Sequence, residues 1–350
     1  MFAAPTLARL SALALIATTA VACGAEDGND KTDAKKATSV TVVTHDSFAL
    51  PEELTKKFET DTGLKLKLLK QGDVGTLVNK LVLTKDSPLA DAVYGIDNTF
   101  ASRAVDEGVL ADVENNAPEA YDLEGDGADQ LAAVDYSDVC VNIDDTWFES
   151  RELPKPASFD DLAKPMYKDM LATPGATSSS PGLAFLIATI AAKGEGWQDY
   201  WKKLVANGAE ITSGWTEAYE GQFTQGGGKG KRPIVVSYSS SPPFTVAEAT
   251  GKPTTSALLD TCFRQVDYAG VLEGAENPDG AEQFVEFMQS DEVQKALPDS
   301  MYVYPVADVP LPAAWAKFAT PAEKPWEMSA DDIAAKRTEW LREWRDIATN

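Results

Sequence analysis

The chain has 350 residues, with 31 Lys and Arg against 55 Asp and Glu, which gives a formal net charge of −24 at pH 7. This charge argues against nucleic acid and anionic lipid surfaces as partners, because contacts to phosphate need clustered Lys and Arg. The single histidine, His45, excludes metal sites that are built from several histidines.

The first 22 residues have the pattern of a secretory signal peptide. Arg9 precedes the apolar run LSALALIATTAVA, which is too short to span a membrane and leads into small residues. Cys23 follows directly, and TAVACG is similar to the lipoprotein box of bacteria, although Ala20 stands where Leu is usual. We therefore expect residues 1–22 to be removed and Cys23 to be lipidated. The alternative is ordinary signal cleavage nearby.

Residues 23–38 form a predicted tether. After the cysteine, the segment GAEDGNDKTDAKKAT is polar and carries few apolar side chains, so it cannot bury enough surface to fold. We expect a mature protein that is anchored by lipid to the outer face of the cytoplasmic membrane, in the periplasm or at the cell surface.

From residue 39 onward, strand patterns alternate with helix patterns, which indicates an α/β fold. The predicted helix at 51–63 has Leu54 and Phe58 on one face and ends at Gly63. Strands are predicted at 39–46, 64–70, 91–96, 170–176, 209–213 and 233–238, and helices at 51–63, 76–86, 178–194, 197–208 and 329–348. The length that follows the tether suits two lobes better than one core.

Three cysteines are present, and Cys23 is assigned to the lipid. Cys140 and Cys262 then remain as one pair in an oxidising compartment, which favours a disulfide between them. The alternative is two buried free thiols.

Motifs typical of enzymes are missing from the sequence. It contains no G-x-S-x-G and no G-x-G-x-x-G, and the run GGGKGKR has the wrong spacing for a phosphate-binding loop. We expect a protein that is not an enzyme and that carries no cofactor and no metal.

Polar and aromatic residues gather where predicted strands end. Ligands of open α/β sheets bind at the carboxyl ends of strands, so these residues are the candidates for binding. They include acids, hydroxyls and aromatics that suit a flat organic cation: His45, Asp46, Asp73, Asp97, Ser178, Ser179, Ser180, Trp215 and Tyr238. Ser180 is also predicted to cap a helix whose first turn, with free N–H groups at Gly182 and Leu183, could bind an anion. Ordinary capping is the alternative for that serine.

Several of these stretches together resemble the solute-binding proteins of bacterial thiamine ABC transporters, in the lipoprotein form. The similar stretches follow the order of that family and span nearly the whole mature chain: VTHDSF (43–48), ADAVYGIDN (90–98), SSSPGL (178–183), GWTEAY (214–219), VVSYSSSP (235–242), YVYPVADVPLP (302–312) and AAKRTEWLREW (334–344).

The resemblance implies a two-lobe fold of the type II periplasmic-binding-protein class, with the ligand in a cleft between the lobes. Lobe 1 would comprise residues 39–137 and 264–302, lobe 2 residues 138–263, and residues 303–350 a helical segment that packs on the lobes. The ligand contacts implied are His45, Asp46, Asp73, Asp97, Ser179, Ser180, Trp215, Tyr219, Tyr238, Phe244 and Tyr302. His45 and Phe244 stand where the family pattern suggests Tyr, and Tyr302 where it suggests Trp.

The function implied is capture of thiamine, or of its phosphates, and delivery to the permease subunits of an ABC transporter by a monomer. One alternative is a binder of another small organic cation or of a ferric complex. A second is a thiamine-processing enzyme, which would need a nucleophile that faces the cleft.

Overall fold

The computed structural model describes residues 37–125 and 127–349 of the chain. The predicted signal peptide, Cys23 and the predicted tether up to residue 36 lie outside these ranges. Within them, no helix has both the length and the apolar character that a membrane span requires.

One ten-stranded mixed sheet organises the described chain, with the order β2-β1-β3-β11-β5-β8-β6-β7. Two short strands pair beside this path, β4 with β11 and β12 with β5, and β9 and β10 form a separate ribbon. The strands are β1 (Ser39–Thr44), β2 (Lys65–Lys70), β3 (Ala92–Asp97), β4 (Leu110–Ala111), β5 (Ala132–Asp144), β6 (Leu171–Pro174), β7 (Glu210–Thr212), β8 (Ile234–Tyr238), β9 (Val246–Ala247), β10 (Lys252–Pro253), β11 (Thr255–Leu272) and β12 (Tyr304–Pro305).

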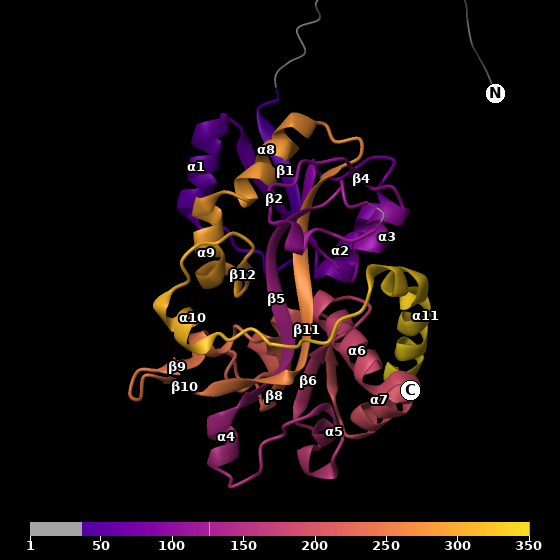
Figure 1. Ribbon diagram of the computed structural model, residues 1–350, viewed down its shortest axis with the longest axis vertical. Coiled ribbons are helices and arrows are strands. Elements are labelled where there is room, and N and C mark those ends of the chain that lie inside the picture. The colour runs from indigo at the N-terminus through magenta and orange to yellow at the C-terminus, as the bar shows by residue number, and fades with distance from the viewer. Residues whose placement is uncertain (1–36, 126, 350) are drawn as a thin grey trace, which may run out of the picture. The chain divides into compact units, whose positions relative to one another are not determined.

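Two long strands connect the two ends of the sheet. At one end β1, β2 and β3 run parallel, and at the other end β6, β7 and β8 run parallel. Between them β5 and β11 are antiparallel to each other and run through the middle of the molecule from one half into the other (Figure 1). The chain therefore has two α/β halves that share these two strands.

Helices cover both halves. In the first half they are α1 (Glu52–Thr62), α2 (Val74–Leu83), α3 (Ala101–Asp106), α8 (Pro278–Met288) and α9 (Asp291–Met301), and in the second half α4 (Asp145–Glu149), α5 (Phe159–Leu162), α6 (Ser180–Lys193) and α7 (Trp197–Ala206). As the sequence predicts, α1 buries Leu54 and Phe58 and ends at Gly63, whose positive φ of 72° suits glycine. The helix predicted at 76–86 begins earlier, at Val74, because Asp73 caps its first turn, and it ends at Leu83.

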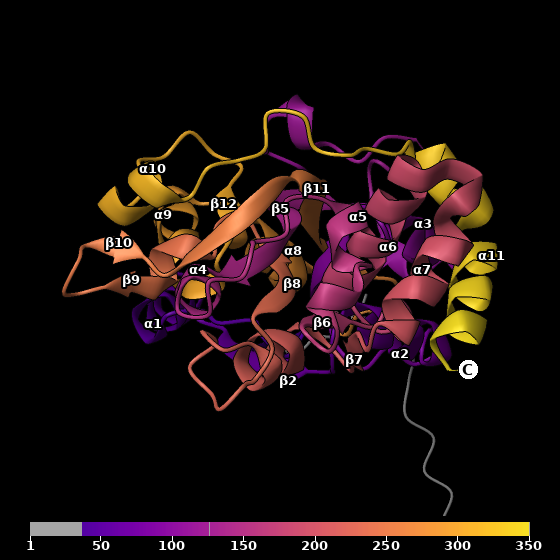
Figure 2. The same ribbon diagram turned by 90° about the horizontal axis from the view of Figure 1, so that it is seen from below.

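The C-terminal segment contains α10 (Ala313–Phe318) and α11 (Ala330–Ala348). The longer helix begins at the Ser329 cap and contacts both halves. Trp344 packs edge-on against Trp201 of α7, and Arg337 lies over the ring of Phe100, just before α3. Figure 2 shows α6, α7 and α11 together on one flank and α10 with the β9–β10 ribbon on the opposite flank.

Cys140 of β5 and Cys262 of β11 form a disulfide, with their Cα atoms 4.2 Å apart. The bond therefore joins the two strands that the halves share. The predicted boundaries between the lobes also fall inside these strands, at Asp138 and Arg264. These two residues are cross-strand neighbours and form an ion pair.

Candidate functional site

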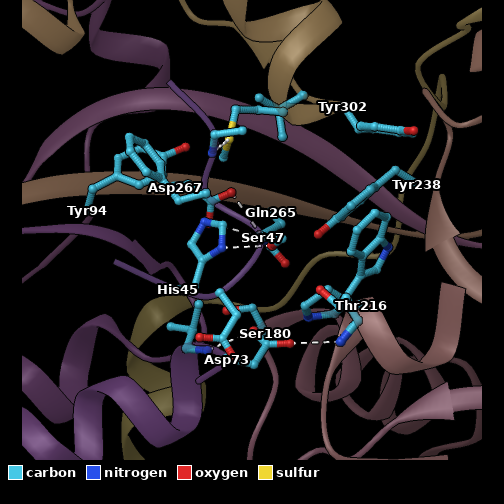
Figure 3. Close-up of a pocket in the computed structure, with 18 of the residues that line it drawn as sticks. His45, Ser47, Asp73, Tyr94, Ser180, Thr216, Tyr238, Gln265, Asp267 and Tyr302 are labelled. Carbon is cyan, nitrogen blue, oxygen red and sulfur yellow. Dashed lines mark hydrogen bonds between the residues drawn. The ribbon is translucent and has the colours of Figure 1, made fainter. Parts of the chain in front are cut away.

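A cavity of about 300 Å³ lies where the halves meet (Figure 3). Seven of the predicted contacts line it: His45, Asp46, Asp73, Ser180, Trp215, Tyr238 and Tyr302. Figure 3 shows Tyr94 and His45 on one side and Tyr238 and Tyr302 on the opposite side. Its volume is at the lower end of the range for small-molecule sites.

His45 follows β1 directly, so its ring enters the cavity from the carboxyl end of a parallel strand. The ring lies against the backbone of β3 at Gly95, where a Cβ atom would come within 2.4 Å of His45 Cδ2. Its Nδ1 is 2.8 Å from the Ser47 hydroxyl, and its centroid is 5.7 Å from that of Tyr94. Burial lowers the pKa of His45, which favours the neutral imidazole.

Asp73 links the two halves. Its Oδ1 accepts a hydrogen bond from the Val74 amide of α2 at 2.7 Å, and its Oδ2 accepts one from the Trp215 amide at 2.9 Å. A second link is nearby, where the Thr76 amide donates to the Ser178 carbonyl at 3.3 Å. The Asp73 carboxylate thus holds the backbone at Trp215, in the second half, against the first turn of α2 in the first half.

Replacing Gly214 with Ala is expected to disturb this link. A Cβ atom at Gly214 would lie 2.8 Å from Asp73 Oδ2 and 3.1 Å from Asp73 Cβ, so the carboxylate would have to move away from the Trp215 amide. Loss of a hydrogen bond to a charged group costs about 1.5–3 kcal/mol. Because this bond holds the two halves together around the cavity, ligand affinity should fall roughly tenfold or more. Calorimetry checks this, and Gly221→Ala, whose Cβ would meet only Glu217 Cγ at 3.8 Å, is the matched control. Equal affinities for the two variants would contradict the role of this contact.

Trp215 provides an aromatic wall and is also tightly packed. Its side chain is 6% exposed, and its Nε1 donates to the Ser237 hydroxyl at 3.0 Å. Tyr219 lies parallel to the indole at 5.1 Å between ring centroids, on the π-helical turn Glu217–Gln222. Tyr219 does not line the cavity; it supports the indole from behind.

Tyr302 reaches the cavity through an unusual backbone conformation. It ends α9 with φ 65°, a left-handed conformation that non-glycine residues seldom adopt. The Ser240 hydroxyl donates to its carbonyl and stabilises this conformation. Phe244 stacks on the phenol with centroids 3.5 Å apart and does not itself line the cavity.

The start of α6 differs from the prediction. The helix begins at Ser180, so Ser179 is its capping residue, and its side chain makes no capping hydrogen bond. The Leu183 amide donates to the Ser179 carbonyl at 2.9 Å, so it is not free for an anion as predicted. Ser180 and Pro181 line the cavity, whereas Ser179 is fully buried beside it.

Asp97, a predicted ligand contact, lies outside the cavity wall. It is fully buried and does not line the cavity. Its Oδ1 accepts hydrogen bonds from the Thr99 amide at 2.7 Å and the Phe100 amide at 2.9 Å, which fixes the turn before α3. Burial raises its pKa, and the hydrogen bonds from Thr99 and Phe100 act in the opposite direction.

Three residues inside strands belong to the cavity wall and were missed by sequence reasoning, which considered only strand ends. They are Tyr94 on β3 and Gln265 and Asp267 on β11. The sequence does contain a pattern that could have identified Asp267. The triplet Val-Asp-Tyr occurs at 134–136 and again at 266–268, and each time it puts a carboxylate inside an apolar strand. Buried acids of this kind mark functional sites.

The wall of the cavity is more acidic than basic. It contains the carboxylates of Asp46, Asp73, Glu220 and Asp267, with Lys70 as its one Lys or Arg among the described residues. Lys70 donates to the Asp46 carbonyl at 3.0 Å. No cluster of three or more His, Cys, Asp or Glu in the described part of the chain could hold a metal ion. The arrangement suits an aromatic cation better than an anion or a metal.

Comparisons with known proteins agree with this architecture. The family model described as bacterial extracellular solute-binding protein matches residues 87–330. The thiamine-binding periplasmic protein of Salmonella typhimurium is 32% identical over 312 residues, which cover 87% of this chain and 92% of that protein.

Solved structures show the same fold. A periplasmic thiamin binding protein is 29% identical, with a TM-score of 0.79 over 89% of this chain and 96% of that chain. Iron-bound HitA from Pseudomonas aeruginosa, at 22% identity, has a TM-score of 0.66 over 88% of this chain and 99% of its own. The predicted type II periplasmic-binding-protein fold is therefore confirmed, and the chain belongs to the bacterial extracellular solute-binding protein family.

Proposed function

We propose that this protein captures thiamine in the cavity between its halves and delivers it to the permease subunits of an ABC transporter. The observation that carries the proposal is the cavity, which combines the aromatic faces of Trp215, Tyr238 and Tyr302 with four carboxylates. The relative from Salmonella typhimurium, whose name states thiamine binding, supports the same ligand.

Thiamine suits this wall because it carries a permanently positive thiazolium ring and a flat aminopyrimidine ring. Each aromatic face over a cationic ring contributes roughly 0.5–2 kcal/mol, and the contribution is larger where water is excluded. The Trp215 indole and the Tyr238 ring are stacked, with their centroids 5.8 Å apart at an interplanar angle of 28°, and both line the cavity. The carboxylates add an attraction that a neutral or anionic ligand would lack.

Thiamine phosphates are a second form of the ligand that the start of α6 could accept. If the phosphate lies at this helix start, Ser180→Ala should weaken binding of the phosphates several-fold more than binding of thiamine, because one hydrogen bond to a charged group is lost. Ser179→Ala is the matched control, since both serines are buried and only Ser180 lines the cavity. Calorimetry with thiamine and thiamine monophosphate checks this, and equal losses for both ligands would contradict it.

The proposal includes a cellular setting. We infer export through the signal peptide at 1–22, lipidation of Cys23, and action as a monomer that is anchored on the outer face of the cytoplasmic membrane. We also infer that the protein is not an enzyme and uses no cofactor, with thiamine as cargo. The sulfurs of Cys140 and Cys262 support this inference, because they are bonded to each other and offer no nucleophile.

Native mass spectrometry of the protein purified from its own host tests the ligand without prior choice. We expect one thiamine, or one thiamine phosphate, per chain. Added ferric iron should not displace it, because the described residues offer no cluster of metal ligands. A bound ferric complex or a different organic cation would overturn the proposal.

A further inference from the structure

Three aspartates lie in one row across neighbouring strands. Asp267 of β11 is the cross-strand partner of Asp97 of β3 on one side and of Asp135 of β5 on the other. Residues directly opposite each other in antiparallel strands point to the same face, and like charges in such positions destabilise the sheet. If all three aspartates were ionised, the row would lower the stability of the fold.

The row is buried and forms no ion pair. Asp97 and Asp135 are fully buried, and Asp267 is 7% exposed. Asp135 accepts a hydrogen bond from the Tyr94 hydroxyl, and Asp267 accepts from the Gln265 amide at 3.0 and 3.1 Å. Among the ion pairs of the described residues, none involves these three carboxylates. Asp267 is the member of the row that lines the cavity.

We propose that Asp267 is the internal counter-charge for the thiazolium ring of the ligand, and that it shares a proton with Asp135 until the ligand expels that proton to solvent. This inference rests on the proposed function and names the residue through which the cavity distinguishes a cationic ligand from a neutral one. Asp267 touches the ligand, whereas Asp135 and Tyr94 act through it as positioning residues.

The protonation of the empty site agrees with this geometry. Burial raises the pKa of Asp135 to about 7, and burial together with the charges of Asp135 and Asp97 raises the pKa of Asp267 well above its usual range. The other titratable groups that face the row are Tyr94 from β3, Tyr238 from β8 and Tyr268 from β11, and each has a raised pKa and is neutral at pH 7. The charge of Asp73 also helps to raise the pKa of Tyr238. The Arg337 guanidinium of α11 interacts electrostatically with Asp97.

The raised pKa values of Asp135 and Asp267 determine how thiamine affinity should change with pH. A cation beside Asp267 stabilises the charged carboxylate, so the pKa of the pair falls on binding and a proton is released. Affinity should therefore rise as the pH rises toward and above about 7 and level off once the pair is ionised in the empty protein.

The test uses thiamine and a neutral isostere in which a thiophene ring replaces the thiazolium ring. Calorimetry of the unmodified protein in two buffers of different ionisation enthalpy counts the protons released. Near pH 7 we expect binding of thiamine to release between a fraction of a proton and one proton, and binding of the isostere to release none. Because the isostere retains the aminopyrimidine ring, it also corrects for titration of that ring. No proton release with thiamine would overturn the inference and leave thiamine binding itself intact. If neither compound bound, the proposed function would fail instead.

A variant pair gives an independent result. Asp267→Asn should reduce the preference for thiamine over the isostere on the order of tenfold. It should not lower the melting temperature of the ligand-free protein, because burial and the neighbouring carboxylates raise the pKa of Asp267, and Asn keeps this side chain uncharged. Asp91→Asn is the control, since Asp91 is 6% exposed, accepts the Thr41 amide and does not line the cavity. An unchanged preference in Asp267→Asn would overturn the inference, because the ligand charge would then be recognised elsewhere.

Discussion

Replacing Trp215 with Ala is expected to lower thiamine affinity by about 30- to 1000-fold, which corresponds to a loss of about 2–4 kcal/mol. The substitution removes an apolar face and the attraction between that face and a cationic ring. Trp215→Phe should restore much of the affinity, because it retains an aromatic face, although it loses the hydrogen bond to Ser237.

The same substitution should also lower the stability of the empty protein. The indole is 6% exposed and lies on Tyr219, so Ala leaves a cavity, and large-to-small changes of aromatic residues cost about 3–5 kcal/mol. Trp344→Ala is the matched control, because this indole is 3% exposed and packs on Trp201, outside the cavity. We expect both variants to melt at lower temperature and only Trp215→Ala to lose affinity in its folded fraction. Normal binding by the folded fraction of Trp215→Ala would contradict the role of the residue.

Replacing Cys140 and Cys262 together with Ser is expected to lower the free energy of unfolding by about 2–4 kcal/mol, because the bond restricts the unfolded chain between residues 122 positions apart. The bond joins β5 and β11 close to the Asp138–Arg264 ion pair, where the halves share strands. Urea unfolding of the oxidised protein and of the double variant measures the difference. Thiol titration of the denatured, unreduced mature protein should find no free thiol at either position, and two reactive thiols would contradict the disulfide.

The repeated strand and helix patterns made most of the first half predictable. Strands expected at 39–46, 64–70 and 91–96 correspond to β1, β2 and β3, because each is a short run of β-branched or alternating residues next to a turn. The closing helix was also predictable, since Ser329 caps it and its buried residues recur at helical spacing.

The pairing of β5 with β11, the two strands that the halves share, could not be predicted from local patterns. Strand β5 pairs with β11, and their partners are separated by more than 110 positions in the sequence, so local patterns carry no information about the register. The row of Asp97, Asp267 and Asp135 depends on that register. Each aspartate was visible in the sequence, but their proximity was not.

The cavity itself was predicted best where a strand ends. His45, Asp73 and Tyr238 follow or end strands, and all three line the cavity. The family resemblance implied contacts from Tyr219 and Phe244, but neither residue lines the cavity; they stack on Trp215 and Tyr302, which do. Similarity of sequence identifies an aromatic residue without showing which of two stacked rings faces the cavity.

Titration calorimetry of the mature protein with thiamine, followed in parallel by tryptophan fluorescence, tests the central claim most directly. We predict tight one-to-one binding with quenching of the fluorescence, since Trp215 lines the cavity and is 5.8 Å from Tyr238 and from Tyr302 between ring centroids. No heat and no quenching at micromolar thiamine would contradict the account.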